Sequence, residues 1–472
     1  MSNRNNLIDL CESKSEKKKL NVLLQEYFFD DVSFAITTLL ELKNIDILQE
    51  LFKIQDFQSK LGAGFYKFFP EIIDKDLNLP KLIDFHSILN SAEKLLKRKL
   101  EYEDQIQKTG YPLDFNPIKT WDYTKSPKSS MINIKIDIGA IKLLLDLLKD
   151  GSSSNELIDR IVNLNSIKNT FIHRKMLGYI PEPLMNQENL KKLLNYIISD
   201  NPINKIWYWL NPWNFYNIAD YKMNQQNYQD LIDYIEQHLD QILNTIDSRL
   251  RCFCPEDYYF SDTFALTFEW GIRGWVTNEM AGCNLEFFKN DLNSLIRTII
   301  HEIYHRIQLN ILSTQNRTKE DLSFNSIVKR DLGNLYDNKF YETISYIYLE
   351  GSATYVGGSN EKISKTENIL NGLNLIKSIY EKLYKEKNIE EADELINSGM
   401  ISNGPFYSLG NYMTSKIVEV YRRDECYHEL LEGTISFFKK YNEAYNKDLL
   451  ESDIWYGSKI ADRILYFDEL ID

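Results

Sequence analysis

The sequence predicts a mainly α-helical protein with one small antiparallel β-sheet, an α+β arrangement. Apolar residues recur every three or four positions through most of the 472-residue chain, a spacing typical of amphipathic helices. Short segments rich in β-branched and aromatic residues occur between Thr263 and Phe288, separated by glycines, and they indicate strands. A chain of this length exceeds one ordinary hydrophobic core, so we expect more than one domain.

The first region, residues 1–110, is predicted to be all-helical from segments such as LNVLLQEYFF and HSILNSAEKLLKRKLEYE. It carries no chemical motif, so its role is not assigned. Residues 111–130 contain three prolines together with lysines and serines, which predicts a linker without regular structure. Residues 131–472 are expected to form a second folded region. This region opens with INIKIDIGAIKLLLDLLKDG, a pattern that predicts a strand running into a helix.

Residues 155–250 are again expected to be helical, with an interruption at NPINKIWYWLNPWNFYN. The tryptophans of this segment favour a packed core, with a substrate-lining surface as the alternative: Trp207, Trp209 and Trp213. The segments TFALTFEW, IRGWVT and GCNLEFF are predicted to form the antiparallel sheet. An exposed edge of this sheet would suit an extended peptide held through backbone hydrogen bonds, although a purely structural sheet fits equally well.

The helix predicted over residues 291–310, DLNSLIRTIIHEIYHRIQLN, carries the main chemical motif of the chain. Asp291, Asn293 or Ser294 is placed to cap its N-terminus. Because its apolar residues recur at helical spacing, we expect the helix to be buried. These residues are Leu295, Ile296, Ile299, Ile300, Ile303 and Ile307.

His301 and His305 lie four residues apart on this helix and therefore share one face, which suits the chelation of a metal ion. Glu302 points slightly to the side, where it can activate a metal-bound water without binding the metal itself. A random order of the same composition yields H-E-x-x-H roughly 0.006 times, so chance explains the motif poorly. Two core histidines bonded to carbonyls are the alternative. Because buried imidazoles and a carboxylate are costly to desolvate without a cation, we expect one zinc ion per chain.

A catalytic zinc ion usually has three protein ligands, so the two histidines require one more donor. Gln308 and Ile311 occupy the positions where metzincins carry glycine and histidine, which excludes that class. The segment FYETISYIYLEGSATYVGG predicts a second buried helix, ended by its last two glycines. Glu350 on this helix is followed by small residues that allow a close helix approach, and it is our expected third ligand. Glu342 is the competing donor.

These motifs resemble those of the gluzincins, zinc metallopeptidases with an H-E-x-x-H helix and a glutamate ligand on a later helix. The sequence is most similar to a group of uncharacterised bacterial proteins described as putative zinc-dependent peptidases. IIHEIYHRIQ, YLEGSATYV and YSLGNYM carry the resemblance, which extends from about Ile132 to the C-terminus. It implies a zincin-like catalytic domain over residues 131–472. Thermolysin-like members have an aspartate four residues after the glutamate ligand that orients a zinc histidine, whereas this chain has Thr354.

Many gluzincins use a tyrosine or histidine from a late helix to stabilise the negative charge that develops on the scissile carbonyl oxygen. The resemblance implies Tyr407 for this role, near the start of a helix that follows the Gly404-Pro405 break. Gly410, one turn later, leaves room for a partner helix. His428, in DECYHEL, is the alternative donor.

The expected function is zinc-dependent hydrolysis of peptide bonds in peptides or proteins, with Glu302 activating the zinc-bound water. The alternative is a catalytically inactive, metallopeptidase-like module that binds a protein partner. The formal net charge of −14 argues against a nucleic-acid partner, for which a basic face is the usual footprint. The sequence has no apolar run long enough for a membrane span or a secretory signal, and its five cysteines favour reduced thiols. We therefore expect a cytoplasmic protein that makes no membrane contact, and oligomeric state is not assigned.

Overall fold

A computed structural model describes residues 130–471. Gaps in this description fall at 151–154, 178–186, 199–220, 223, 269–272, 289–290, 316–327, 329, 359–362, 401–403, 422–429 and 447–453. The predicted N-terminal helical region, nearly all of the predicted linker, the three tryptophans and His428 therefore lie outside the described residues. Within the described ranges, no helix is long and apolar enough to span a bilayer.

A four-stranded sheet with the strand order β1-β2-β4-β3 forms the first layer of the fold. Its strands are β1 (Met131–Asp137), β2 (Tyr259–Thr267), β3 (Gly274–Val276) and β4 (Ala281–Asn284). β1 and β4 both run parallel to β2, and only β3 runs antiparallel to its neighbour β4.

The predicted antiparallel sheet is therefore wrong, because the sheet is mixed. The expected strand segments are present, but the opening strand of the second region pairs in parallel with β2 along its whole length, from Met131 against Tyr259 to Asp137 against Ala265. β3 follows β2 in the chain but lies outside β4, so β2 and β3 are not neighbours in the sheet. Residue patterns indicate where strands form but leave their partners open.

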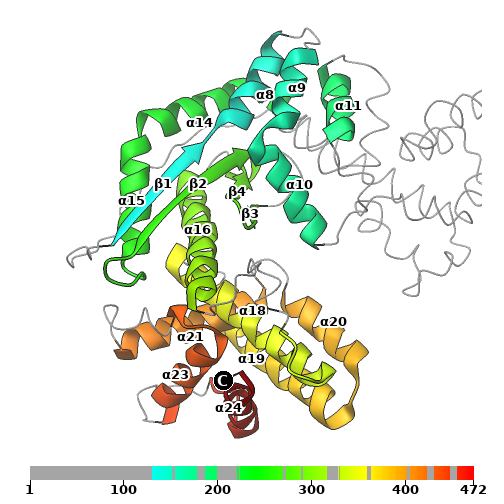
Figure 1. Cartoon of the computed structure of the whole chain (residues 1–472), viewed down its shortest axis with the longest axis vertical. Coiled ribbons are helices and arrows are strands. Elements are labelled where there is room, and N and C mark those ends of the chain that lie inside the picture. The colour runs from blue at the N-terminus through cyan, green and yellow to red at the C-terminus, as the bar shows by residue number, and fades with distance from the viewer. Residues whose placement is uncertain are drawn as a thin grey trace, which may run out of the picture.

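Helices of the N-terminal half surround this sheet (Figure 1). They are α8 (Gly139–Asp150), α9 (Asn155–Asn163), α10 (Asn165–Leu177), α11 (Gln187–Ile198), α14 (Gln225–Gln237) and α15 (Leu239–Arg251). α15 packs against β1 and α8 packs against β2. The predicted strand-to-helix opening is confirmed by β1 and α8.

The C-terminal half is a group of packed helices. They are α16 (Leu292–Gln315), α18 (Leu335–Gly357), α19 (Thr366–Glu381), α20 (Ile389–Gly399), α21 (Pro405–Tyr421), α23 (Thr434–Asn446) and α24 (Ser458–Ile471), with a short 3-10 helix, η4 (Leu285–Phe288), before α16 and a π-helical turn, η5 (Lys382–Glu386), after α19.

α16 joins the two halves. It runs from the sheet, where it packs against β3 and β4, to the C-terminal helices, where it packs against α18 (Figure 1). α18 in turn packs against α21. One continuous hydrophobic core includes residues of the sheet, of α16 and of the C-terminal helices. The motif helix is therefore placed between an edge of the sheet and two helices that follow it in the chain.

Candidate metal centre and active site

The burial predicted for the motif helix is confirmed by α16. The six residues of its apolar stripe are each at most 1% exposed. Its N-terminus is capped by Asp291, whose side chain accepts a hydrogen bond from the backbone N–H of Ser294 at 2.8 Å. Burial of the stripe fixes the rotation of the helix, and this rotation turns its polar residues toward α18 and β3.

Three donor atoms from two helices meet beside α16. The Nε2 atoms of His301 and His305 lie 3.1 Å apart. One carboxylate oxygen of Glu350, on α18, lies 3.3 Å from the Nε2 of His301 and 3.4 Å from that of His305. Side chains of all three residues are at least four-fifths buried. The three atoms form a nearly equilateral triangle.

The dimensions of this triangle fit a zinc ion. Tetrahedral zinc with bonds of about 2.0–2.1 Å separates its ligand atoms by about 3.3–3.4 Å. Two imidazole nitrogens and one carboxylate oxygen are also a donor set found in catalytic zinc sites, which leave a fourth position open. Glu302 is a second nearby carboxylate, since one ligand atom each from His301, Glu302 and His305 lie within 4.8 Å of one another. One carboxylate oxygen of Glu350 lies within 3.4 Å of both histidine nitrogens, whereas Glu342 lies 3.8 Å from Lys339.

The charge distribution favours an ionised Glu350. Burial alone would raise the pKa of its carboxyl group, but electrostatic attraction by the adjacent rings of His305 and His301 favours the charged form. Their effect is larger, and the pKa lies well below its usual value. A carboxylate that stays charged while buried is suited to hold a divalent cation.

A chain of hydrogen bonds on the side away from the three donor atoms orients the ring of His305. Its Nδ1 lies 3.0 Å from the side-chain oxygen of Gln308, one turn further along α16. The Gln308 amide donates to the hydroxyl of Ser352 on α18 at 2.9 Å, and Ser352 donates to the carbonyl of Tyr348 at 2.7 Å. Gln308 and Ser352 are completely buried. Because Nδ1 is engaged by an acceptor, Nε2 is left with its lone pair directed at the three-donor centre.

Sequence reasoning missed this chain of hydrogen bonds. From the sequence, Gln308 serves only to exclude a metzincin, and the residue that supports the histidines is not assigned, because Thr354 stands where thermolysin-like members carry an aspartate. Thr354 is buried, and no hydrogen bond joins it to either histidine among the described residues. The available signal was the spacing, since residues three apart on a helix are neighbours and a glutamine can accept from an imidazole N–H.

Tyr407 on α21 lies beside the three donors. Its ring is nearly parallel to that of His301, with centroids 6.5 Å apart and planes 14° apart, and its hydroxyl lies in the electrostatic field of Glu350. Burial raises the pKa of this hydroxyl well above its usual value, and the charges of Glu350 and Glu302 raise it further. The group therefore stays protonated and can donate.

Two glycines allow α21 to pack closely against α18, which carries Glu350. A Cβ on Gly351 of α18 would lie 2.2 Å from the Cα of Gly410, and a Cβ on Gly410 would lie 2.0 Å from the carbonyl oxygen of Ile347. The partner-helix approach expected at Gly410 is confirmed. The crossing places Tyr407, one turn before Gly410, against Glu350, the neighbour of Gly351.

The edge strand β3 passes directly beside Glu302. A Cβ on Gly274, the first residue of β3, would lie 2.2 Å from a carboxylate oxygen of Glu302. Only glycine permits this approach without movement of the glutamate. Burial raises the pKa of Glu302 above its usual value, although the two histidines partly oppose the shift.

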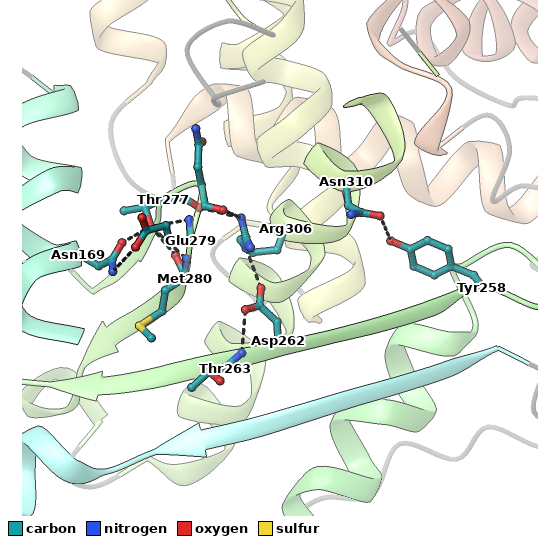
Figure 2. Close-up of polar contacts among 10 residues, drawn as sticks. Asn169, Tyr258, Asp262, Thr263, Thr277, Glu279, Met280, Arg306 and Asn310 are labelled. Carbon is teal, nitrogen blue, oxygen red and sulfur yellow. Dashed lines mark hydrogen bonds and ion pairs between the residues drawn. The ribbon is translucent and has the colours of Figure 1, made fainter. Parts of the chain in front are cut away.

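Arg306 fixes the position of β3 relative to α16. It follows His305, and it forms an ion pair at 2.7 Å with Asp262 of β2. Its guanidinium also donates to the carbonyls of Thr277 and Asn278, in the turn between β3 and β4, at 3.0 and 2.6 Å. Figure 2 shows the Arg306 side chain between β2 and this turn. Arg306 therefore connects α16, which carries the histidines, to β2 and to the turn between β3 and β4.

The same turn is also held from α10. Asn169 accepts a hydrogen bond from the hydroxyl of Thr277 at 2.7 Å (Figure 2). On the other side of Arg306, the Tyr258 hydroxyl donates to Asn310 of α16 at 2.8 Å (Figure 2). The first contact holds the turn that follows the edge strand β3, and the second joins α16 to the segment that leads into β2.

Comparison with known proteins agrees with this site. No curated protein and no solved structure matches the chain. A family model described as "Putative zinc dependent peptidase (DUF5700)" matches residues 158–449, more than half of the chain, and includes α16, α18 and α21. This match covers the histidine motif and its buried, metal-compatible setting, and the chain belongs to the family described in these words.

Proposed function

We propose that this protein hydrolyses peptide bonds in peptides or proteins, and that it does so as a gluzincin with one zinc ion held by His301, His305 and Glu350. The observation that carries the proposal is the triangle of three donor atoms, with sides of 3.1–3.4 Å. A zinc ion bound there would lower the pKa of the attacking water and polarise the scissile carbonyl.

Glu302 is the proposed general base. It lies on the same helix as the histidines but faces the edge strand, at the position of Gly274. Its carboxylate takes a proton from the attacking water and later gives that proton to the leaving amine. The burial that raises its pKa supports this role, because a base with a pKa nearer the working pH both accepts and releases protons efficiently.

Tyr407 is the proposed donor to the carbonyl oxygen of the substrate. Its hydroxyl is protonated and held close to Glu350 by the glycine crossing of α18 and α21. A preorganised donor aimed at the developing oxyanion stabilises the transition state more than the ground state.

The substrate is expected to bind as an extended chain along β3. This strand is the last in the sheet order, and among the described residues no other strand pairs with its outer edge. Backbone groups of an edge strand can hydrogen-bond an added strand, whatever its side chains are. A peptide held in this way passes beside Glu302.

Metal analysis of the purified full-length chain together with digestion of a broad peptide library tests the proposal. We expect about one zinc ion per chain, cleavage of peptides, loss of cleavage after treatment with a chelator, and recovery on addition of zinc. One zinc ion per chain without cleavage of any peptide would instead favour a catalytically inactive module that binds a partner.

A further inference from the structure

Two arginines lie at the end of β3 nearest Glu302. Arg273 directly precedes Gly274, and its guanidinium donates a hydrogen bond to the Ser294 hydroxyl on α16 and lies 5.0 Å from the centroid of the Phe288 ring. Arg297 lies three residues after Ser294 and four before His301. Residues at this spacing share one face of a helix. The two arginines and the histidine centre therefore follow one another along the side of α16.

A half-buried guanidinium group is normally paired with a carboxylate, and neither arginine has such a pair among the described residues. Among the described residues, no carboxylate lies within 4.0 Å of either guanidinium. The Nε of Arg297 is fully buried and makes no hydrogen bond within the part of the chain that the structure describes. The pKa of Arg273 is lowered by burial and also by the charge of Arg297, although Asp291 and Glu302 partly oppose this. Two neighbouring cations in an acidic protein are unfavourable unless an anion joins them.

The direction of β3 indicates which part of a substrate would meet these arginines. Antiparallel strand pairs are two to three times more common than parallel ones. A peptide added antiparallel to β3 runs with its C-terminal side toward the N-terminal end of β3, where Arg273 lies. Since one residue spans about 3.3 Å along a strand, Arg273 falls about one or two residues beyond the bond that faces Glu302.

We infer that Arg273 and Arg297 form a carboxylate-binding subsite on the leaving-group side of the scissile bond. This inference rests on the proposed function. The carboxylate is either the C-terminus of a substrate from which a short peptide is released, or an acidic side chain within one or two residues of the cleavage point. Guanidinium groups bind either form of carboxylate through charge-assisted hydrogen bonds.

Peptide binding to the full-length, zinc-loaded protein with Glu302→Gln, which suppresses turnover, tests the inference. Three peptides of equal length serve as probes: one with neutral side chains and a free C-terminus, one with an aspartate and an amidated C-terminus, and one with an asparagine and an amidated C-terminus. Calorimetry should show one of the first two binding at least about tenfold more tightly than the asparagine amide. Which of the two binds more tightly identifies the source of the carboxylate.

Arg297→Gln and Arg273→Gln, each added to that protein, should remove the preference, while Arg160→Gln, the same change at an exposed position of α9, should keep it. Arg297→Lys keeps the positive charge and should retain part of the preference. It is the control that distinguishes loss of the guanidinium group from misfolding of the glutamine variants. Equal binding of the three probes, no binding at millimolar concentration, or a preference that survives both glutamine substitutions would overturn the inference. Failure of the zinc-loaded parent to cleave any peptide would contradict the proposed function, and the binding preference would remain measurable.

Discussion

Replacement of Gln308 by leucine should weaken zinc binding without unfolding the protein. Leucine fills a similar volume, so the main change is loss of the amide that joins His305 to Ser352. The imidazole Nδ1 loses its acceptor at 3.0 Å and the Ser352 hydroxyl loses a donor at 2.9 Å, both in a fully buried setting. The ring of His305 is then free to rotate or to change tautomer, and either change removes its Nε2 lone pair from the metal.

The expected loss of zinc affinity is about 10- to 100-fold, the range found when the outer hydrogen-bond partner of a metal-bound histidine is removed. This corresponds to about 1.4–2.7 kcal/mol of binding free energy. Competition with a fluorescent zinc chelator measures it directly and does not depend on catalytic activity. Thermal unfolding of the metal-free protein, monitored by circular dichroism, reports separately on the fold.

Two further variants test whether Gln308 acts by orienting His305 or only by filling space. Gln308→Glu keeps an acceptor for Nδ1 and should bind zinc more tightly than Gln308→Leu. Ser352→Ala leaves the bond to His305 intact and should cause a smaller loss. Parental zinc affinity in a folded Gln308→Leu protein would refute the reasoning, because Gln308 would then act only in packing.

Three other outcomes follow from the geometry. Glu350→Gln should lower zinc affinity by at least about 10- to 100-fold, whereas Glu342→Gln, two turns earlier on the same helix, should leave it unchanged; the reverse pattern in the chelator assay would exchange their roles. Tyr407→Phe keeps the ring beside that of His301 and removes the hydroxyl, so kcat should fall by about 100-fold with zinc content unchanged, and a parental kcat would leave Tyr407 as a packing residue. Gly410→Ala should destabilise the fold by about 1–3 kcal/mol because the added methyl group overlaps the backbone of α18; an unchanged midpoint of urea unfolding would show that the two helices can separate freely.

The local elements of the fold were predictable where periodicity and capping agree. The apolar stripe and Asp291 correctly indicated a buried, capped α16, and the glycine pair after Val356 correctly indicated the end of α18, where Gly358 adopts a φ of 87°. The sheet was harder. β-branched and aromatic residues located its strands, but the parallel pairing of β1 with β2 joins segments more than a hundred residues apart, and no local pattern records such a contact.

In the candidate site too, features local to one helix were predictable from the sequence, whereas contacts between distant elements were not. The spacing of His301 and His305 is local to one helix, so the sequence determined it directly. The approach of Glu350 depends on how α18 crosses α16, and the small residues after it indicated only that a close crossing was possible. Gly351 in fact faces α21, while the contact with α16 involves Ser352 and Gln308. The place of Gly274 beside Glu302 depends on the mixed sheet and had no local signal.

The most direct test of the central claim is a comparison of Glu302→Gln with the parent protein on one cleaved peptide, with zinc measured in the same samples. If Glu302 is the general base and only the histidines and Glu350 hold the metal, the variant should keep about one zinc ion per chain while kcat falls at least about 100-fold. A Glu302→Gln protein that contains zinc and cleaves the peptide at the parental rate would contradict the account.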